Sequence, residues 1–346
     1  MSENNNLLIC PACNGSGKVG AGKCLACQGF GAGLWQNGRF LYWNKVITRR
    51  ELQRKKIEKF LKTVLSFATF IFGFGALAFL AWRIWEVGFI SIFDATFWIS
   101  GRPEVILFLL SLISDFYLVY QFSMERALKG RVEKREYSEK ADERIKTAPV
   151  GEITDWMAVR QLPAKEKIDV AKTLSSEAER ALVDAWKAAL KFGHAEVLPI
   201  HLFGALLFSG KAAVVFGRLG INVKTLQEKI IKQLGALPAN LPERGEPVLS
   251  PAGILVFFDS YFKAYEARRE QIDIAELLLA TAESEEIIQE ILYSLEVDLT
   301  KLKNVVEWLK ISELLRKKWK ESRTLARLRP GGTMSRAMTA MATPYL

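Results

Sequence analysis

Four cysteines near the amino terminus are the residues of this chain best suited to chemistry. Cys10 and Cys13 form one Cys-x-x-Cys pair, Cys24 and Cys27 form another, and no other cysteine occurs in the 346 residues. Four thiolates at this spacing can surround one ion tetrahedrally, and zinc is the usual occupant of a closed Cys₄ site. The pattern therefore predicts a metal module over residues 7–33 that holds one Zn²⁺. Because so short a segment buries little apolar surface, the ion would supply most of its folding free energy.

Three other uses of these cysteines are open. An iron centre of the rubredoxin type would use the same four thiolates and would make the chain an electron-transfer protein. A disulfide pair would require an oxidising compartment. A nucleic-acid ribbon would depend on a few neighbours such as Lys18 and Trp35, which offer little charge and stacking. We therefore expect a metal ion and no nucleic-acid partner.

Each cysteine pair is followed by Gly-x-Gly, with Gly15 and Gly17 after the first pair and Gly29 and Gly31 after the second. Glycine adopts positive φ without strain, which lets backbone N–H groups point at the cysteine sulfurs. The repeated CxxCxGxG resembles the zinc-binding repeat of DnaJ-type chaperones. Those proteins typically carry four repeats and two zinc ions, so the two repeats here imply one ion. No His-Pro-Asp tripeptide occurs, and the resemblance therefore does not extend to a J domain.

Two apolar runs, Thr63–Trp82 and Val105–Met124, are each 20 residues long. A helix of that length crosses the hydrocarbon core of a bilayer. The sequence therefore predicts a transmembrane hairpin over residues 63–124. Asp115 lies near the middle of the second run, where an ionised carboxylate is unfavourable. We expect Asp115 to be satisfied by polar neighbours such as Ser111 or by another subunit.

Basic residues near the two runs predict the orientation of the hairpin. Nine Lys or Arg residues lie within residues 39–62 and five within residues 126–135, whereas the connecting segment has only Arg83 and Arg102. Basic residues stay on the cytoplasmic side, so both termini should be cytoplasmic in a two-pass protein of the inner cell membrane. Residues 39–62 are expected to form a basic juxtamembrane helix. Much of the net charge of +10 lies beside the two apolar runs, and we expect it to attract anionic lipid of the bilayer.

Short amphipathic helices dominate the second half of the chain. Residues 125–172 form a highly charged linker, and residues 173–310 then show apolar faces at helical spacing. The pattern returns after about 75 residues, since Leu219–Leu226 is answered by Leu295–Leu302. An internal duplication accounts for this similarity. The predicted fold class is all-α, with two four-helix units, a transmembrane hairpin and the small Cys₄ module.

The first of the two units resembles the Clp repeat, the doubled four-helix unit at the N-terminus of Clp-type AAA+ unfoldases. The matching features are Gly193-His194, the helix start Pro199-Ile-His-Leu202, and Leu219–Leu226. The second unit has Arg268-Arg269 for Gly-His and Glu276 for the second histidine. In that family the domain binds adaptor proteins or unfolded substrates. The resemblance therefore implies protein partners of this kind, together with Clp-type ATPase or protease components.

Aromatic residues on one predicted helix are the candidate partner-binding residues. This set consists of Phe257, Phe258, Tyr261 and Tyr265. Their spacing is typical of a helical core face, and any exposed part would be the first place to look for a peptide groove. His194 and His201 are the only histidines and are not accompanied by a cluster of carboxylates or cysteines. We expect them to be buried or capping residues and not catalytic ones.

No catalytic constellation is visible in the sequence. The phosphate-binding pattern GxxxxGK[ST] does not occur, so we expect no enzyme activity. Residues 311–346 are expected to be a basic helix and a linker that leads toward an ATPase module outside this chain, which leaves oligomerisation open. The overall prediction is a membrane-anchored, non-catalytic recognition segment of a Clp-type unfoldase or protease system in protein quality control. The alternatives are a stand-alone membrane scaffold or adaptor and a Cys₄ electron-transfer protein.

Overall fold

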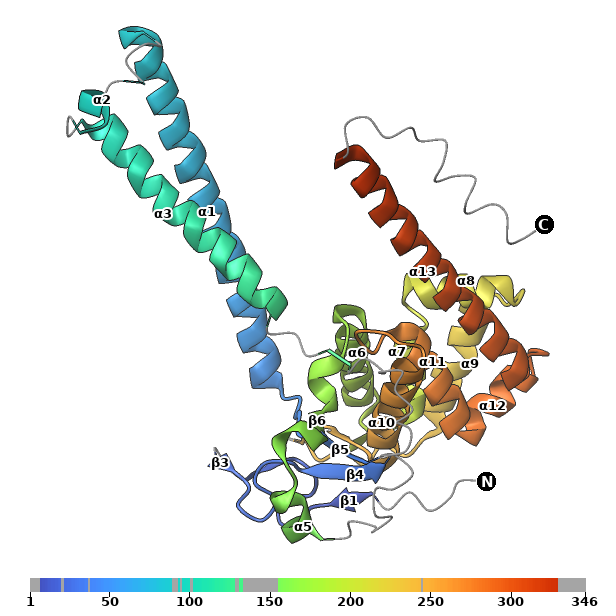
Figure 1. Ribbon diagram of the computed structural model, residues 1–346. Helices are drawn as coiled ribbons and strands as arrows, with labels where there is room; N and C mark the ends of the chain where they lie inside the picture. Colours follow the sequence, from blue (N-terminus) through green and yellow to red (C-terminus); the bar gives the residue numbers. More distant parts are fainter. Residues whose placement is uncertain are drawn as a thin grey trace.

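A helical body, a small sheet module packed against it and a long projecting hairpin make up this chain (Figure 1). The computed structural model describes residues 7–19, 22–36, 38–88, 93, 95–99, 102–127, 131–132, 155–243 and 245–328. Most of the expected linker, residues 125–172, lies outside the described residues, as does everything after residue 328.

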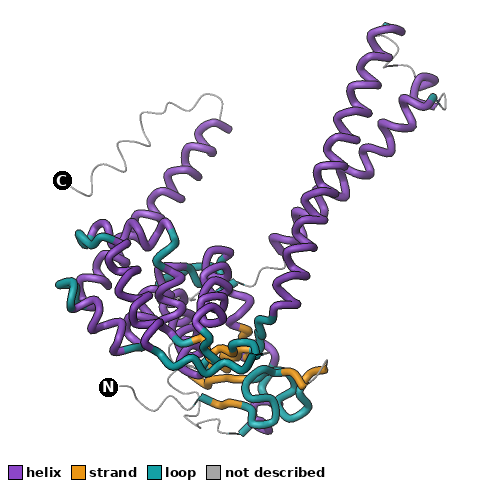
Figure 2. Tube along the Cα trace, turned by 180° about the vertical axis from the view of Figure 1, so that it is seen from behind, coloured by secondary structure: helices purple, strands orange, loops and turns teal. Residues whose placement is uncertain are grey.

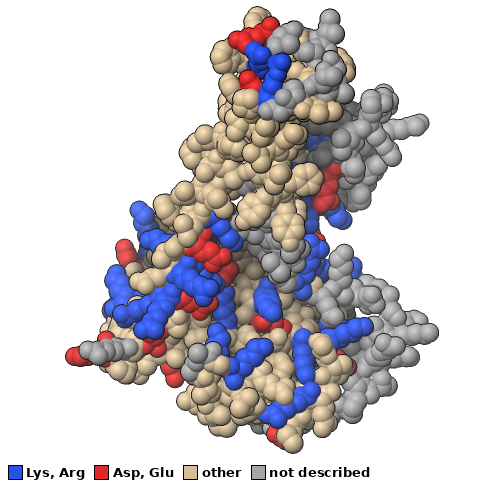
Figure 3. Space-filling view, turned by 90° about the vertical axis from the view of Figure 1, so that its left-hand side faces the viewer, with Lys and Arg blue, Asp and Glu red and all other residues tan. Residues whose placement is uncertain are grey.

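The hairpin consists of α1 (Arg49–Val87) and α3 (Pro103–Ala127), with the short helix α2 (Ala95–Ile99) near its tip. Thr48 caps α1, because its side chain accepts a hydrogen bond from the Glu51 N–H at 3.1 Å. The two long helices pack side by side (Figure 2). In the face shown by Figure 3, a largely uncharged band separates the charged tip of the hairpin from the charged body.

Asp115 lies against α1 at Gly73. A Cβ atom added to Gly73 would lie 3.1 Å from the Asp115 Oδ1 atom, so glycine makes room for the carboxylate at this point. Ser111, one of the partners expected for Asp115, donates to the Phe108 carbonyl oxygen at 2.8 Å. The helix pair therefore meets through a small residue, as helices in membranes commonly do.

Within the described residues, one helix, Arg49–Glu86, is long and apolar enough to cross a membrane. The pair α7 (Pro199–Leu206) and α8 (Gly210–Arg218) has a similar composition, but it is bent by 87° and contributes to the core of the body. The two-pass anchor remains a prediction.

A small mixed sheet corrects the expected all-α fold. Its strand order is β1 (Leu8–Ile9), β4 (Ala32–Gln36), β5 (Arg39–Trp43) and β6 (Lys167–Asp169). β4 and β5 form an antiparallel hairpin through Gly38, whose φ of 72° suits glycine. Residues 39–62 are therefore not one helix, because the alternating aromatic segment Arg39–Trp43 pairs with β4. A second, two-stranded ribbon of β2 (Lys18–Val19) and β3 (Gly22–Lys23) joins the cysteine pairs.

The last part of the expected linker also belongs to this module. β6 pairs in parallel with β5, although more than 120 residues separate them in the sequence. The short helix α5 (Trp156–Gln161) packs on the cysteine cluster through Trp156. The prediction of a linker is therefore wrong for residues 155–169.

The body contains two four-helix units, which agrees with the predicted duplication. The first unit comprises α6 (Ser176–Phe192), α7, α8 and α9 (Val223–Ala236), and the second comprises α10 (Pro251–Glu266), α11 (Ile274–Ser284), α12 (Glu286–Tyr293) and α13 (Leu299–Leu328). The boundary expected at residue 310 falls inside α13, which continues without a break.

Two short backbone pairings relate the units by a pseudo-twofold arrangement. Leu174, just before α6, pairs in parallel with Ile272, just before α11. In the same way β8 (Val248–Leu249), just before α10, pairs in parallel with β7 (Glu196–Val197), just before α7. The first helix of each unit is thus tied to the second helix of the other.

The altered residues of the second unit repeat the structural role of the two histidines. His201 Nδ1 accepts the Leu198 N–H at 3.1 Å, and Glu276 Oε2 accepts the Asp273 N–H at 3.0 Å, so each caps the second helix of its unit. His201 Nε2 lies 2.7 Å from His194 Nδ1, whereas Glu276 Oε1 lies 3.5 Å from Arg269 Nε. A buried histidine pair in one unit is replaced by an ion pair in the other.

This geometry requires His201 to be neutral. Since Nδ1 accepts a backbone hydrogen bond, the ring proton resides on Nε2 and is donated to His194. Burial, followed by the neighbouring His194, lowers the pKa of His201 to about 4. The unfolded chain, with an ordinary histidine pKa of about 6.5, therefore takes up the proton more readily.

Stability should consequently be complete above about pH 6.5 and should fall as the pH drops toward 4, by on the order of 3 kcal/mol from this group. Urea unfolding of the chain in mild detergent, followed by tryptophan fluorescence between pH 7.5 and 4, measures the effect.

The His201→Gln variant is the matched test. A neutral amide can still accept the Leu198 N–H but does not titrate, so the loss of stability in this window should shrink. An undiminished pH dependence in this variant would show that other groups cause it.

Candidate metal centre and its contact with the helical body

The four cysteine sulfurs converge on one point. All four Sγ atoms lie within 4.8 Å of one another, with 3.9 Å between Cys10 and Cys24 and 3.7 Å between Cys13 and Cys27. A tetrahedral site with metal–sulfur bonds of about 2.3 Å has sulfur–sulfur edges of about 3.8 Å. These separations exceed a disulfide bond of about 2.05 Å by far, and all four cysteines are free. The residues therefore fit a metal ion held by four thiolates.

The two Cys-x-x-Cys turns are near copies of each other and depend on their glycines. The Gly17 N–H donates to Cys13 Sγ at 3.2 Å, and the Gly31 N–H donates to Cys27 Sγ at 3.3 Å. Both glycines have φ near 70°, and a Cβ on either would collide with a backbone oxygen of the other turn. The predicted role of the glycine pairs, to aim N–H groups at sulfur, is present in the structure.

The surroundings of the cysteines shift the pKa values of individual thiols in different directions. Burial raises the pKa of Cys13 to about 12 and also raises the pKa of Cys27. A hydrogen bond from the Cys27 backbone lowers the pKa of Cys24 to about 7. A bound cation would favour the ionised form of the Cys13 and Cys27 thiols, which burial disfavours.

α5 covers one side of the cysteine cluster. The Trp156 ring contacts the cysteines and meets Phe40 edge to face at 6.1 Å. Arg160 Nη2 donates to the carbonyl oxygens of Leu25 and Ala26, which lie between Cys24 and Cys27. The segment after the hairpin therefore contributes directly to the metal module.

The other side of the module shares one hydrophobic core with the helical body. Trp43 of β5 stacks on Phe257 of α10 with 4.5 Å between the ring centroids, and both side chains are at most 2% exposed. The shared core also includes Ala32, Leu34 and Leu41 of the module. We call this contact between β4–β5 and the helices α6 and α10 the seam.

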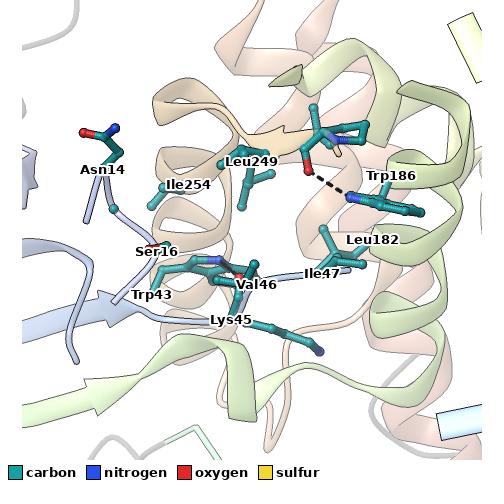
Figure 4. Close-up of a pocket in the computed structure, with 14 residues that line it drawn as sticks. Asn14, Ser16, Trp43, Lys45, Val46, Ile47, Leu182, Trp186, Leu249 and Ile254 are labelled. Atoms are coloured by element: carbon teal, nitrogen blue, oxygen red, sulfur yellow. Dashed lines mark hydrogen bonds between the residues drawn. The ribbon is translucent and has the colours of Figure 1, made fainter. Parts of the chain in front are cut away.

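Polar contacts continue the seam toward α1. Lys45 Nζ lies 2.8 Å from Glu179 Oε1, and Lys55 of α1 reaches the same carboxylate at 3.2 Å. A small cavity remains between the first cysteine turn and α6, lined by Asn14, Ser16, Trp43, Lys45 and Trp186 among others (Figure 4). The Trp186 Nε1–H crosses to the Pro247 carbonyl oxygen at 2.9 Å.

The seam occupies the surface expected to receive a partner. Phe257, Phe258 and Tyr261 are 0%, 1% and 1% exposed, so these side chains cannot form an open groove. Tyr265 is half-buried, and the Arg39 guanidinium lies 5.5 Å from its ring centroid. The aromatic face of α10 is therefore core, partly covered by the chain's own metal module. His194 and His201 are likewise buried, as expected.

Comparisons with known proteins agree on the helical body. Residues 173–295 match the family model "Clp repeat (R) N-terminal domain". A 73-residue stretch is 32% identical to the chaperone protein ClpB of Clostridium tetani (strain Massachusetts / E88) and covers 20% of this chain. That stretch represents only 8% of the length of ClpB.

Solved structures of Clp N-domains are also similar. The Hsp104 N-terminal domain of Candida albicans matches 40% of this chain and 91% of its own at 16% identity, with a TM-score of 0.37. The N-terminal domain of the ClpV1 ATPase of E. coli matches 40% and 87% at 22% identity, with a TM-score of 0.35. The assignment rests on the family match and not on these weaker similarities. Residues 173–295 form a Clp-type N-terminal repeat domain.

Removal of the metal should loosen the seam, because the fold of the module depends on its ion while α10 depends on Trp43 for cover. Treatment of the full chain with a strong chelator should accelerate amide hydrogen exchange in α10. Exchange in α9 and α12, which pack mainly on α7, α8, α11 and each other, should stay unchanged and serves as the internal control. Equal acceleration in all helices, or none in α10, would contradict a shared core.

Proposed function

We propose that this chain is a membrane-anchored receptor that presents a Clp-type N-terminal domain beside the inner face of the cell membrane. There it captures unfolded proteins or adaptors for a Clp-type ATPase or protease. The observation that carries the proposal is the seam. Through it the repeat domain packs directly on the module from which the long apolar helix α1 begins, six residues after Trp43. A recognition domain fixed in this way stays close to the bilayer.

The client-binding surface must lie away from the buried face of α10. Phe208, in the turn between α7 and α8, is 76% exposed, and Val214 on the outer face of α8 is 48% exposed. The second unit folds with polar side chains at the equivalent positions. The corresponding positions of the second unit are Glu283 and Glu290, which are polar, as a solvated surface favours.

An apolar partner explains this difference between the units. Exposed aromatic and branched side chains on one repeat offer contacts to the apolar stretches of an unfolded protein. Lys211 lies between the two positions on the same segment, but it is engaged by Asp273 and by Glu177 at 3.2 Å. We therefore place the client surface on the α7–α8 turn and the start of α8.

The metal module has a structural role in this proposal, with one zinc ion held by Cys10, Cys13, Cys24 and Cys27. When bound, zinc fixes the two cysteine turns and supplies no redox chemistry. The chain's own residues do the rest, since β5 carries Trp43 to the helical body and α5 closes the module from the other side.

Metal analysis tests the identity of the ion. The chain purified under reducing conditions should be colourless and should contain one zinc per chain. Visible absorption with stoichiometric iron would favour the electron-transfer alternative. The Cys24→Ser variant, which lacks one thiolate, should lose most of the metal in either case.

The double variant Phe208→Glu and Val214→Glu tests the client surface. Loss of one buried phenylalanine contact corresponds to about 2 kcal/mol, so binding of a fluorescently labelled, permanently unfolded casein should weaken at least tenfold. Fluorescence anisotropy of the full chain in detergent micelles measures the affinity.

Ile231→Glu provides the matched control, because Ile231 is 52% exposed on α9 and lies outside the proposed surface. Its affinity should stay within twofold of the parent chain. Equal weakening in both variants would contradict the location of the surface, and absence of casein binding by the parent chain would contradict client capture itself.

A further inference from the structure

The last part of α13 leaves the helical body and exposes an apolar stripe. Lys310 is still buried at 4% exposure, but Ile311, Leu315 and Trp319 beyond it are 56%, 58% and 52% exposed. These three residues are four positions apart and therefore lie on one face of the helix. An exposed stripe with this spacing does not contribute to the core of the body.

Basic residues occupy the rest of this helical surface. Between Leu314 and Arg323 the exposed cations are Arg316, Lys317, Lys318, Lys320 and Arg323, against the single acidic residue Glu321. The Arg323 guanidinium lies 5.2 Å from the Trp319 ring centroid, so the basic and apolar surfaces adjoin. A basic helix with an exposed apolar face that includes tryptophan is typical of helices that lie at a membrane interface.

Ion pairs help to hold α13 against the rest of the second unit. Arg269 Nη2 lies 2.6 Å from Glu313 Oε2, and Lys310 Nζ lies 3.9 Å from the buried Glu276 Oε1. Beyond these contacts the helix projects from the body on the same side as the α1–α3 hairpin, in two views half a turn apart (Figures 1 and 2). The basic amphipathic part, residues 311–323, therefore extends toward the side on which the proposed membrane lies.

We propose that residues 311–323 of α13 dock on the anionic lipid surface of the same membrane that holds the hairpin. This inference rests on the proposed membrane anchor. The apolar stripe enters the headgroup region, and the cations meet lipid phosphates. Two contacts, the hairpin and α13, then hold the repeat domain at the bilayer. A second copy packed on the same stripe would bring two strongly basic helices together with few carboxylates to compensate them.

The test uses the full chain reconstituted into vesicles, with an environment-sensitive nitrobenzoxadiazole label at Ser322→Cys. Ser322 lies three residues after Trp319, on the side of the stripe. The label should brighten and shift to the blue in vesicles with 30% phosphatidylglycerol, but not in pure phosphatidylcholine. The parent chain, which lacks the added cysteine, is carried through the same labelling reaction and corrects for any label on the four native cysteines.

Charge variants separate lipid docking from other causes. Each basic residue near an anionic surface changes the docking constant about fivefold, so the triple change Arg316→Gln, Lys318→Gln and Lys320→Gln should weaken it about a hundredfold. The matched control Lys224→Gln, Lys232→Gln and Lys303→Gln removes the same charge from exposed positions within the body and should leave the signal intact.

Three other results of the vesicle experiment would contradict lipid docking or the membrane anchor. Label fluorescence that does not depend on phosphatidylglycerol but rises with the number of chains per vesicle would indicate self-association and would overturn lipid docking. No shift in a chain that resists carbonate extraction would overturn the inference while leaving the anchor intact. Extraction of the chain by carbonate would contradict the anchor, and the inference with it.

Discussion

The stacking of Trp43 on Phe257 is the contact on which the arrangement of this chain depends. It joins a module that is too small to fold on its own core to a helical body that would otherwise expose aromatic side chains on α10. Large aromatic rings bury more apolar surface than most other side chains, and both rings of this pair belong to the shared core. Two ion pairs beside this contact help to fix where α1 starts relative to the body, because Lys45 and Lys55 both reach Glu179 of α6.

The candidate metal module and the Clp-type repeat domain are therefore physically connected in this chain. The glycine turns orient N–H groups toward the sulfurs, and the strands that follow them carry Trp43 into the body. The chain leaves the module through α1 and returns to it after α3. The returning segment supplies α5 and β6, which complete the module. A closed path of this kind restricts how the hairpin and the body can move apart.

The duplicated helical units show how one fold tolerates different buried groups. A neutral histidine pair and an arginine–glutamate pair occupy equivalent places, and in both the third residue of the second helix caps its own helix start. Burial raises the pKa of Glu276, while Arg269 and Lys310 oppose this shift. The ionic version has one structural consequence that the histidine version lacks. Arg269 also pairs with Glu313, and this contact ties α13 to the segment between α10 and α11.

The sequence by itself determined the local features of this protein. The cysteine spacing, the glycine turns, the apolar run within α1, the helical duplication and the Clp resemblance all depend on residues close together in the chain. The tertiary structure alone decided that the strand Arg39–Trp43 has a second neighbour, β6, which comes from the segment expected to be a linker. It also decided that Phe257, Phe258 and Tyr261 are core. Their apolar spacing is the same whether a helix face meets a partner or another part of its own chain, and only their burial in the folded chain distinguishes the two.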